Sequence, residues 1–159
     1  MMRVYDILVI GEANVDLILS GEDVDPNFGQ KEKLVQDASL ILGGSSAIFA
    51  CGAGKLGLRV GFMGKLGNDF FGEFLIRELQ EFGVDTELII YDSEIKTGLT
   101  LHLSQPNDRA MLTYLGTIES LRCDEISPEI FTQSRHVHLS SFFFAKRYAI
   151  RIGGFVQIG

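Results

Sequence analysis

The hydrophobic positions along the chain fall into short apolar runs separated by longer stretches with a helical period. Residues 6–10 read DILVI and residues 59–63 read RVGFM, each followed by a glycine. Continuous apolar runs of this length are typical of parallel strands that are buried on both faces. Between them, small and apolar residues over 45–56 predict a short helix that ends at Gly57. The order predicts a strand–helix–strand unit.

The middle of the chain continues the alternation of strands and helices. Apolar positions three and four residues apart over 71–82 predict an amphipathic helix that Asn68 or Asp69 caps and Gly83 ends. We predict turns or loops at 21–33 and 66–69, strands at 88–91 and 136–139, an antiparallel pair at 97–103 and 110–115, and a brief helix from Ser127. This order predicts an open α/β sheet with a small β appendage.

Composition and charge narrow the function classes. The 159 residues are 46% hydrophobic and 22% charged, which fits about one compact domain. The net charge of -7 argues against a nucleic-acid partner. No apolar run reaches the roughly 20 residues that span a bilayer, and no secretory signal is evident. We therefore expect a cytoplasmic protein without a membrane partner. Cys51 and Cys123 are far apart and are expected to be free thiols.

Residues 52–57 match the GxGxxG string of dinucleotide-binding proteins. That role requires a strand before the string and a helix after it, whereas here the string lies inside the predicted helix and a strand follows. We expect these glycines to allow close helix packing and to end the helix. The P-loop pattern also fails, because Leu56 stands where Ser or Thr should bind magnesium.

Two polar residues follow the first strand. Asn14 and Asp16 are two residues apart, so in extended chain their side chains point the same way. An amide beside a carboxylate offers the donors and acceptors that a sugar requires, and ligands of open α/β sheets sit at the carboxyl ends of strands. Stabilisation of a turn is the equally weighted alternative.

Gly43 and Gly44 precede the first predicted helix, and Ser45 and Ser46 are candidate N-caps. Glycines here would let a ligand approach the free N–H groups of the first turn. Taken alone, an ordinary tight turn is the better interpretation.

His136 and His138 share one face of a predicted strand, but no acidic or cysteine partner is near them in sequence. We therefore predict structural roles for both histidines and no metal site. Residues 142–144 (FFF) are interpreted as core.

Taken together, an ordered series of motifs resembles the N-terminal half of the PfkB (ribokinase-like) carbohydrate kinases. The series runs from about residue 4 to about 144. It comprises GEANVD at 11–16, the glycine pair with Ser45-Ser46-Ala47, KLGLRV at 55–60, GKLGNDFFG at 64–72, GVD at 83–85, Thr97-Gly98 and the strand at 136–140.

The resemblance implies a Rossmann-like three-layer core with a small β-sheet lid, built from about 15–39 and 97–115. It implies transfer of the γ-phosphoryl group of ATP to a sugar hydroxyl, with Mg²⁺ as the metal. Asn14 and Asp16 would hold sugar hydroxyls, and Gly43, Gly44 and Ser45 would line the same pocket. A homodimer through the lid or an exposed sheet edge is also expected.

The sequence departs from the family pattern at three places. Ile48 stands where many members have asparagine, an apolar replacement that is still compatible with a helix. Family members are about twice as long, and their Gly-Ala-Gly-Asp segment with the catalytic base is not found here. Residues 145–159 do not continue the pattern. We therefore expect a single incomplete α/β domain over 1–159, without a catalytic residue of its own and inactive as a separate chain. A non-catalytic sugar-binding or oligomerising module is the alternative, and a nucleoside kinase relative is a weaker one.

Overall fold

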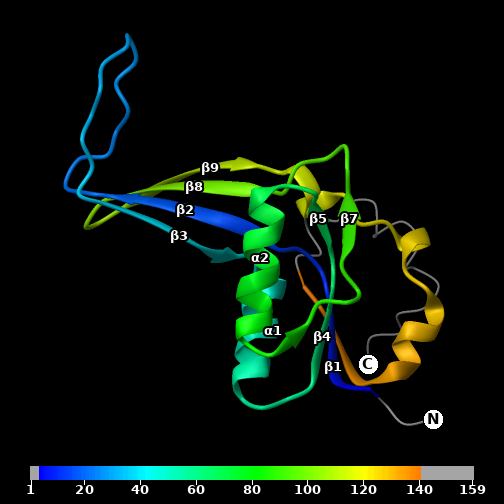
Figure 1. Ribbon diagram of the computed structural model, residues 1–159. Helices are drawn as coiled ribbons and strands as arrows, with labels where there is room; N and C mark the ends of the chain where they lie inside the picture. Colours follow the sequence, from blue (N-terminus) through cyan, green and yellow to red (C-terminus); the bar gives the residue numbers. More distant parts are fainter. Residues whose placement is uncertain (1–3, 141–159) are drawn as a thin grey trace, which may run out of the picture.

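The computed structural model describes residues 4–140, and its centre is a four-stranded parallel sheet in the order β10-β1-β4-β6 (Figure 1). The strands are β1 (Tyr5–Ile10), β4 (Val60–Met63), β6 (Val84–Asp85) and β10 (Ser134–Leu139). Both apolar runs and the strand at 136–139 are confirmed. The predicted tail at 145–159 and the aromatic run at 142–144 lie outside the described residues.

Each face of this sheet is covered by a different layer. The helices α1 (Ser45–Lys55) and α2 (Phe70–Glu81) pack on one face, where Val9, Phe62 and Leu75 are fully buried. The other face packs Leu8 and Met63 against Leu121 and against Ile130 of the 3₁₀ segment η3 (Pro128–Gln133). Two further 3₁₀ segments, η1 (Gly116–Glu119) and η2 (Cys123–Glu125), belong to the same stretch of chain. Figure 1 shows these layers on opposite sides of the sheet. The predicted three-layer α/β core is confirmed.

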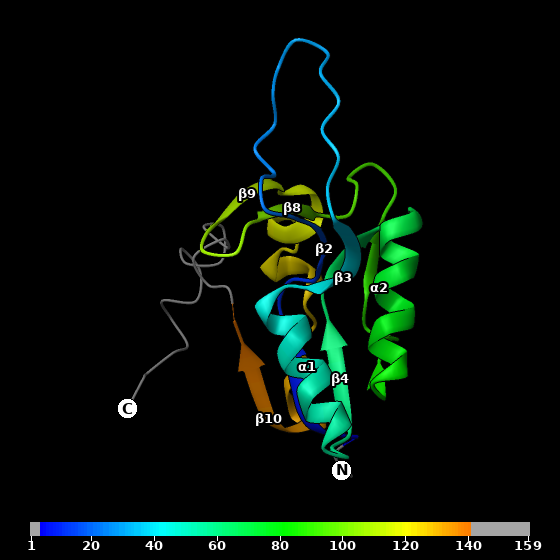
Figure 2. The same cartoon turned by 90° about the vertical axis from the view of Figure 1, so that its left-hand side faces the viewer.

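A second sheet lies next to the core and has the order β3-β2-β8-β9. It consists of β2 (Asn14–Ser20), β3 (Asp37–Gly43), β8 (Leu99–Ser104) and β9 (Arg109–Tyr114). The predicted antiparallel pair is confirmed as β8 and β9, while β2 and β8 are parallel. The connection between β2 and β3, which contains the predicted loop at 21–33, projects away from both sheets (Figure 2).

Both helices end as their sequences predict. Gly57 and Gly83 have φ values of 84° and 75°, the left-handed conformation that commonly ends a helix. Asp69 is the N-cap of α2 and accepts a 2.9 Å hydrogen bond from the Gly72 N–H.

The glycines of the GxGxxG string have separate roles within this arrangement. A Cβ on Gly54 would lie 2.2 Å from the Phe82 carbonyl oxygen, so this glycine allows the close packing we predicted. A Cβ on Gly52 would meet no atom within 4 Å. The packing role predicted for Gly52 is therefore wrong, because its side of α1 is open.

The sequence missed a small parallel ladder. The expected turn at 66–69 is wrong in its first half, since β5 (Lys65–Gly67) pairs with β7 (Ile90–Asp92). A three-residue strand has no periodicity to detect, and it forms here because a parallel partner lies beside it. The strand predicted at 88–91 corresponds to β7. Cys51 and Cys123 are free thiols, as predicted.

Candidate functional site

Asn14 and Asp16 lie side by side at the start of β2, just after the carboxyl end of β1. The Asn14 amide Nδ2 donates a 2.7 Å hydrogen bond to Asp16 Oδ1, so the two side chains share one face as the spacing predicts. Asn14 is buried, whereas the Asp16 side chain keeps 20% of its surface exposed. Within the described part of the chain, Asp16 Oδ2 accepts no hydrogen bond. One carboxylate oxygen is thus held in place, and the other is available.

Gly43 and Gly44 stand against these two residues. Gly43 pairs with Asn14 in the β2–β3 ladder, and a Cβ on Gly43 would lie 2.5 Å from the Asp16 carboxylate. Gly44 has a φ of 92°, and its Cβ would lie 3.2 Å from Asn14 Oδ1. The structure therefore adds a reason for both glycines that the sequence did not reveal. Both glycines leave space for the side chains of Asn14 and Asp16, and not only for a ligand.

Glu12 fixes the N-terminus of α1, a role that the sequence analysis missed. Its Oε1 accepts hydrogen bonds of 2.8 Å from the Ser45 N–H and 3.0 Å from Ser45 Oγ. Its Oε2 accepts a 2.7 Å bond from Ser46 Oγ. Since the first N–H groups of a helix lack intrahelical partners and carry partial positive charge, a buried carboxylate is stabilised there.

This arrangement corrects the capping role predicted for Ser45 and Ser46. The N-cap residue of α1 is Gly44, which has no side chain that could cap the helix. Both serines lie in the first turn and donate to Glu12 instead. The sequence does contain a signal for this role. Glu12 is a carboxylate two residues after a buried strand, and the N-terminus of the helix that follows is expected at the same edge of the sheet. Asn14, Asp16, Gly43, Gly44 and Ser45 are all brought together around this helix end.

His102 on β8 is a further polar residue near this group. Its Nε2 lies 3.4 Å from Asp16 Oδ1, and the His102 side chain is 14% exposed. The nitrogen itself is buried and has no hydrogen-bond partner among residues 4–140. Nothing in the sequence marked His102, since it lies about 86 residues from Asp16 along the chain and only the parallel pairing of β2 with β8 brings them together.

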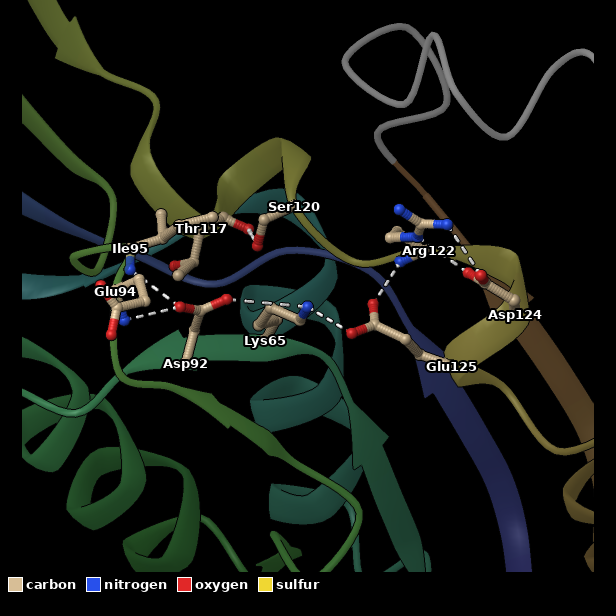
Figure 3. A network of polar contacts seen from close by, with 9 residues as sticks. All are labelled: Lys65, Asp92, Glu94, Ile95, Thr117, Ser120, Arg122, Asp124 and Glu125. Carbon is tan, nitrogen blue, oxygen red and sulfur yellow. Dashed lines mark hydrogen bonds and ion pairs between the residues drawn. The ribbon is translucent and has the colours of Figure 1, made fainter.

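A second polar network surrounds Lys65 (Figure 3). The Lys65 side chain is 7% exposed, and its Nζ lies 2.5 Å from Glu125 Oε1 and 3.8 Å from Asp92 Oδ2. N–H groups of Ile95 and Glu94 donate to Asp92 and lower the pKa of its carboxyl, against the effect of desolvation. Two carboxylates from β7 and η2 thus compensate one buried cation and join these segments to β5.

Asp69 links the start of α2 to Thr97, which lies just before β8. Its Oδ2 accepts a 2.8 Å hydrogen bond from the Thr97 N–H, in addition to the cap on Gly72. Desolvation alone would raise the pKa of Asp69, but hydrogen bonds from Thr97 and Gly72 outweigh it and lower the pKa. Thr97 Oγ1 in turn accepts from the Gly67 N–H at 2.9 Å. These hydrogen bonds therefore fix the point at which the chain passes from the core into β8 of the second sheet.

Of the two histidines of β10, His138 is packed against α1, whereas His136 is exposed. The His138 ring stacks on Phe49 of α1 with centroids 3.7 Å apart. Burial lowers the pKa of His138, and the neighbouring His136 lowers it further. Among residues 4–140, no group of three His, Cys, Asp or Glu side chains is placed to hold a metal ion. No helix in the same range is long and apolar enough to cross a membrane.

A comparison with models of protein families identifies the family of this chain. The model of the pfkB family carbohydrate kinases matches residues 5–149. The chain belongs to this family. The resemblance stated from the motifs is thereby confirmed over nearly the whole chain.

Individual relatives agree with the PfkB assignment. The chain is 30% identical over 148 residues to a 5-dehydro-2-deoxygluconokinase of Listeria monocytogenes, covering 91% of this chain and 44% of the relative. It is 31% identical to the Bacillus subtilis protein of the same name, again over 91% of this chain and 44% of the relative. The chain thus spans less than half of the length of these curated relatives.

Solved structures give the same result. A fructokinase of Halothermothrix orenii superposes with a TM-score of 0.71 at 27% identity, covering 86% of this chain and 46% of that one. An uncharacterized sugar kinase of Pyrococcus horikoshii, in complex with ATP, superposes with a TM-score of 0.70 at 29% identity, covering 84% of this chain and 42% of that one. The described fold is therefore that of the ribokinase-like sugar kinases.

Proposed function

We propose that this chain is the sugar-binding portion of an ATP-dependent PfkB kinase. Its acceptor would be a sugar or sugar acid, and the names of the curated relatives favour 5-dehydro-2-deoxygluconate. The observation that carries the proposal is the Asn14–Asp16 pair, held at 2.7 Å against Gly43. Asp16 Oδ2 would accept a hydrogen bond from a sugar hydroxyl, and the partly exposed carboxylate can do so without a large desolvation cost.

The second sheet would act as the lid of this site. It carries Asp16 and His102 on one face, so closure of the sheet over a bound sugar would keep water away from the reacting hydroxyl. Water exclusion matters because phosphoryl transfer to water competes with transfer to the sugar. The site residues and the lid thus belong to one proposal.

Phosphoryl transfer would require groups beyond those described. ATP and Mg²⁺ are the cofactors that we propose for the complete kinase, supported by the ATP complex of the P. horikoshii relative. Residues 4–140 contain no group of three His, Cys, Asp or Glu side chains that could hold a metal ion by themselves. We propose that the catalytic base and the nucleotide site come from the portion of the family fold that this chain does not span. Free cysteines and the use of ATP favour the cytoplasm as the compartment.

Calorimetric titration of the 159-residue chain tests the sugar-binding proposal. The panel is 5-dehydro-2-deoxygluconate, fructose, ribose and adenosine, each with the wild-type chain, with Asp16→Asn and with Ser39→Ala as the matched control. Ser39 lies on the neighbouring strand β3, is half-buried, and donates its hydroxyl to Asp37 and not to the Asn14–Asp16 pair. We expect at least one sugar to bind, and Asp16→Asn to weaken it about tenfold or more, since a charged hydrogen bond is lost. Binding of adenosine alone would replace the proposal with a nucleoside kinase relative, and binding of none would refute it.

A transfer assay separates the kinase from its alternative. We expect no labelled γ-phosphate to pass from Mg-ATP to the bound sugar in the separate chain, because both the base and the donor site would be lacking. Turnover above background would show that this chain assembles a nucleotide site of its own. Sugar binding by the corresponding complete protein without any transfer would favour the non-catalytic sugar-binding module.

We also propose that two copies associate through the lid. Every residue of the edge strand β9 is exposed, including Met111, Leu112 and Tyr114. An edge strand with apolar side chains is a template for pairing with a second copy. Sedimentation analysis should find a dimer that Leu112→Glu dissociates. A dimer that Leu112→Glu leaves unchanged would contradict association through β9 and would make β10, the edge strand of the central sheet, the next contact to test.

A further inference from the structure

We propose that His102 is a positioning residue that holds the Asp16 carboxylate in its sugar-binding orientation. The inference rests on the proposed function, because it concerns how Asp16 is presented to the acceptor. It goes beyond that function by assigning a role to a residue of β8 whose Nε2 lies 3.4 Å from the acceptor oxygen of the Asn14–Asp16 hydrogen bond.

The first step concerns the His102 imidazole. Its Nε2 is buried, lacks a hydrogen-bond partner in the part of the chain that the structure describes, and lies 3.4 Å from Asp16 Oδ1. Buried nitrogens without partners are rare in folded proteins and call for an explanation. Since a carboxylate only accepts hydrogen bonds, we infer the tautomer with its hydrogen on Nε2, which makes this contact attractive. A small movement of either side chain would then turn it into a hydrogen bond.

The second step concerns the two oxygens of Asp16. Asn14 Nδ2 and His102 Nε2 both approach Oδ1, from β2 itself and from the neighbouring strand β8. A carboxylate that is held by one oxygen from two sides has a fixed rotamer. Its other oxygen then points to a constant position, which lowers the ordering cost when a hydroxyl binds.

The third step concerns the strand pairing. Asp16 faces Thr100 across the parallel β2–β8 ladder, and His102 is two residues further along β8 on the same face. His102 thus reaches back to Asp16 along the diagonal of the sheet. Because both residues belong to the second sheet, a displacement of that sheet as a whole would leave their relative placement unchanged.

Two isosteric amides test the proposal directly. In His102→Gln the side-chain amide nitrogen takes the place of Nε2, whereas in His102→Asn it takes the place of Nδ1 and cannot reach Asp16. Both variants are polar and similar in size, so they should fold alike. We expect the sugar affinity of His102→Gln to stay within about threefold of wild type and that of His102→Asn to fall about tenfold, the loss of one hydrogen bond.

Calorimetric titration with the tightest-binding sugar of the panel gives the affinities, and urea unfolding gives the stabilities. Ser39→Ala is again the control. A merely structural role would make affinity follow stability in both variants, and this result would overturn the inference. Equal affinities of the two variants would overturn it as well. If the wild-type chain binds no sugar at all, the proposed function fails first and His102 has no acceptor site to serve. Sugar binding that His102→Asn leaves unchanged would overturn the positioning role alone.

Discussion

Gly43 provides the space that the Asp16 carboxylate occupies. A Cβ at position 43 would lie 2.5 Å from both carboxylate oxygens, well inside van der Waals contact. The two residues are on adjacent strands, β3 and β2, so neither can withdraw without disturbing the ladder between them. The glycine is therefore tied to the polar pair and not only to the turn that follows it.

Gly43→Ala should displace the Asp16 side chain. We expect the free energy of unfolding to fall by about 1–3 kcal/mol, a typical cost of forcing extra volume into a packed site, and sugar affinity to fall with it. Gly52→Ala is the matched control, since a Cβ there meets no atom within 4 Å. In the helix this control should be neutral or stabilising by about 0.5–1 kcal/mol. Urea unfolding measures both, and equal effects of the two substitutions would contradict the argument.

Removal of the Glu12 carboxylate should loosen the start of α1. Glu12→Ala removes the hydrogen bonds that the carboxylate accepts from the Ser45 N–H and from both serine hydroxyls, and we expect the free energy of unfolding to fall by about 1–3 kcal/mol. Glu12→Gln keeps one acceptor oxygen but loses the negative charge at the positive end of the helix dipole, so it should cost less. Urea unfolding of both variants tests this order. Equal losses would mean that packing, not hydrogen bonding, accounts for the effect.

The contributions of Lys65 and Glu125 to the free energy of unfolding should be coupled. Lys65→Met leaves Asp92 and Glu125 without the buried cation between them, and we expect a loss of about 1–3 kcal/mol, reduced because both carboxylates are partly exposed. Adding Glu125→Gln should recover part of that loss, since one uncompensated charge disappears. A double-mutant cycle in urea measures the coupling. Additive effects would show that the two side chains are independent.

His138 should make the protein less stable in mild acid. Burial, with a smaller contribution from His136, lowers the pKa of His138 in the folded state. As the pH falls below the ordinary value of about 6.5, the unfolded chain binds the proton first and the free energy of unfolding decreases until the folded pKa is passed.

His138→Phe isolates this effect. The variant keeps a ring to stack on Phe49 and removes the titrating group. We expect it to lose less stability than wild type between about pH 7.5 and about pH 5.5 in urea unfolding. The same pH slope in both proteins would assign the sensitivity to other groups.

The local elements could be read from the sequence because each has a local cause. After Asp6 and Arg59, the runs at 6–10 and 59–63 contain no polar side chain because the parallel strands β1 and β4 are covered on both faces. The helical period over 71–82, with Asp69 before it and Gly83 after it, gave α2 with its cap. The spacing of Asn14 and Asp16 placed their side chains on one face. In each case residues a few positions apart contain the whole signal.

The remaining features depend on contacts between distant residues, which only the tertiary structure decides. Glu12 caps α1 across 33 residues of chain, and the ladder of β5 and β7 exists because the two short segments meet. His102 faces Asp16 only because β8 pairs in parallel with β2. Hydrogen bonds and packing of this kind have no period in the sequence, so composition and spacing could not reveal them. The sequence by itself determined the elements, the family and the polar pair, and the assembled sheets determined what surrounds that pair.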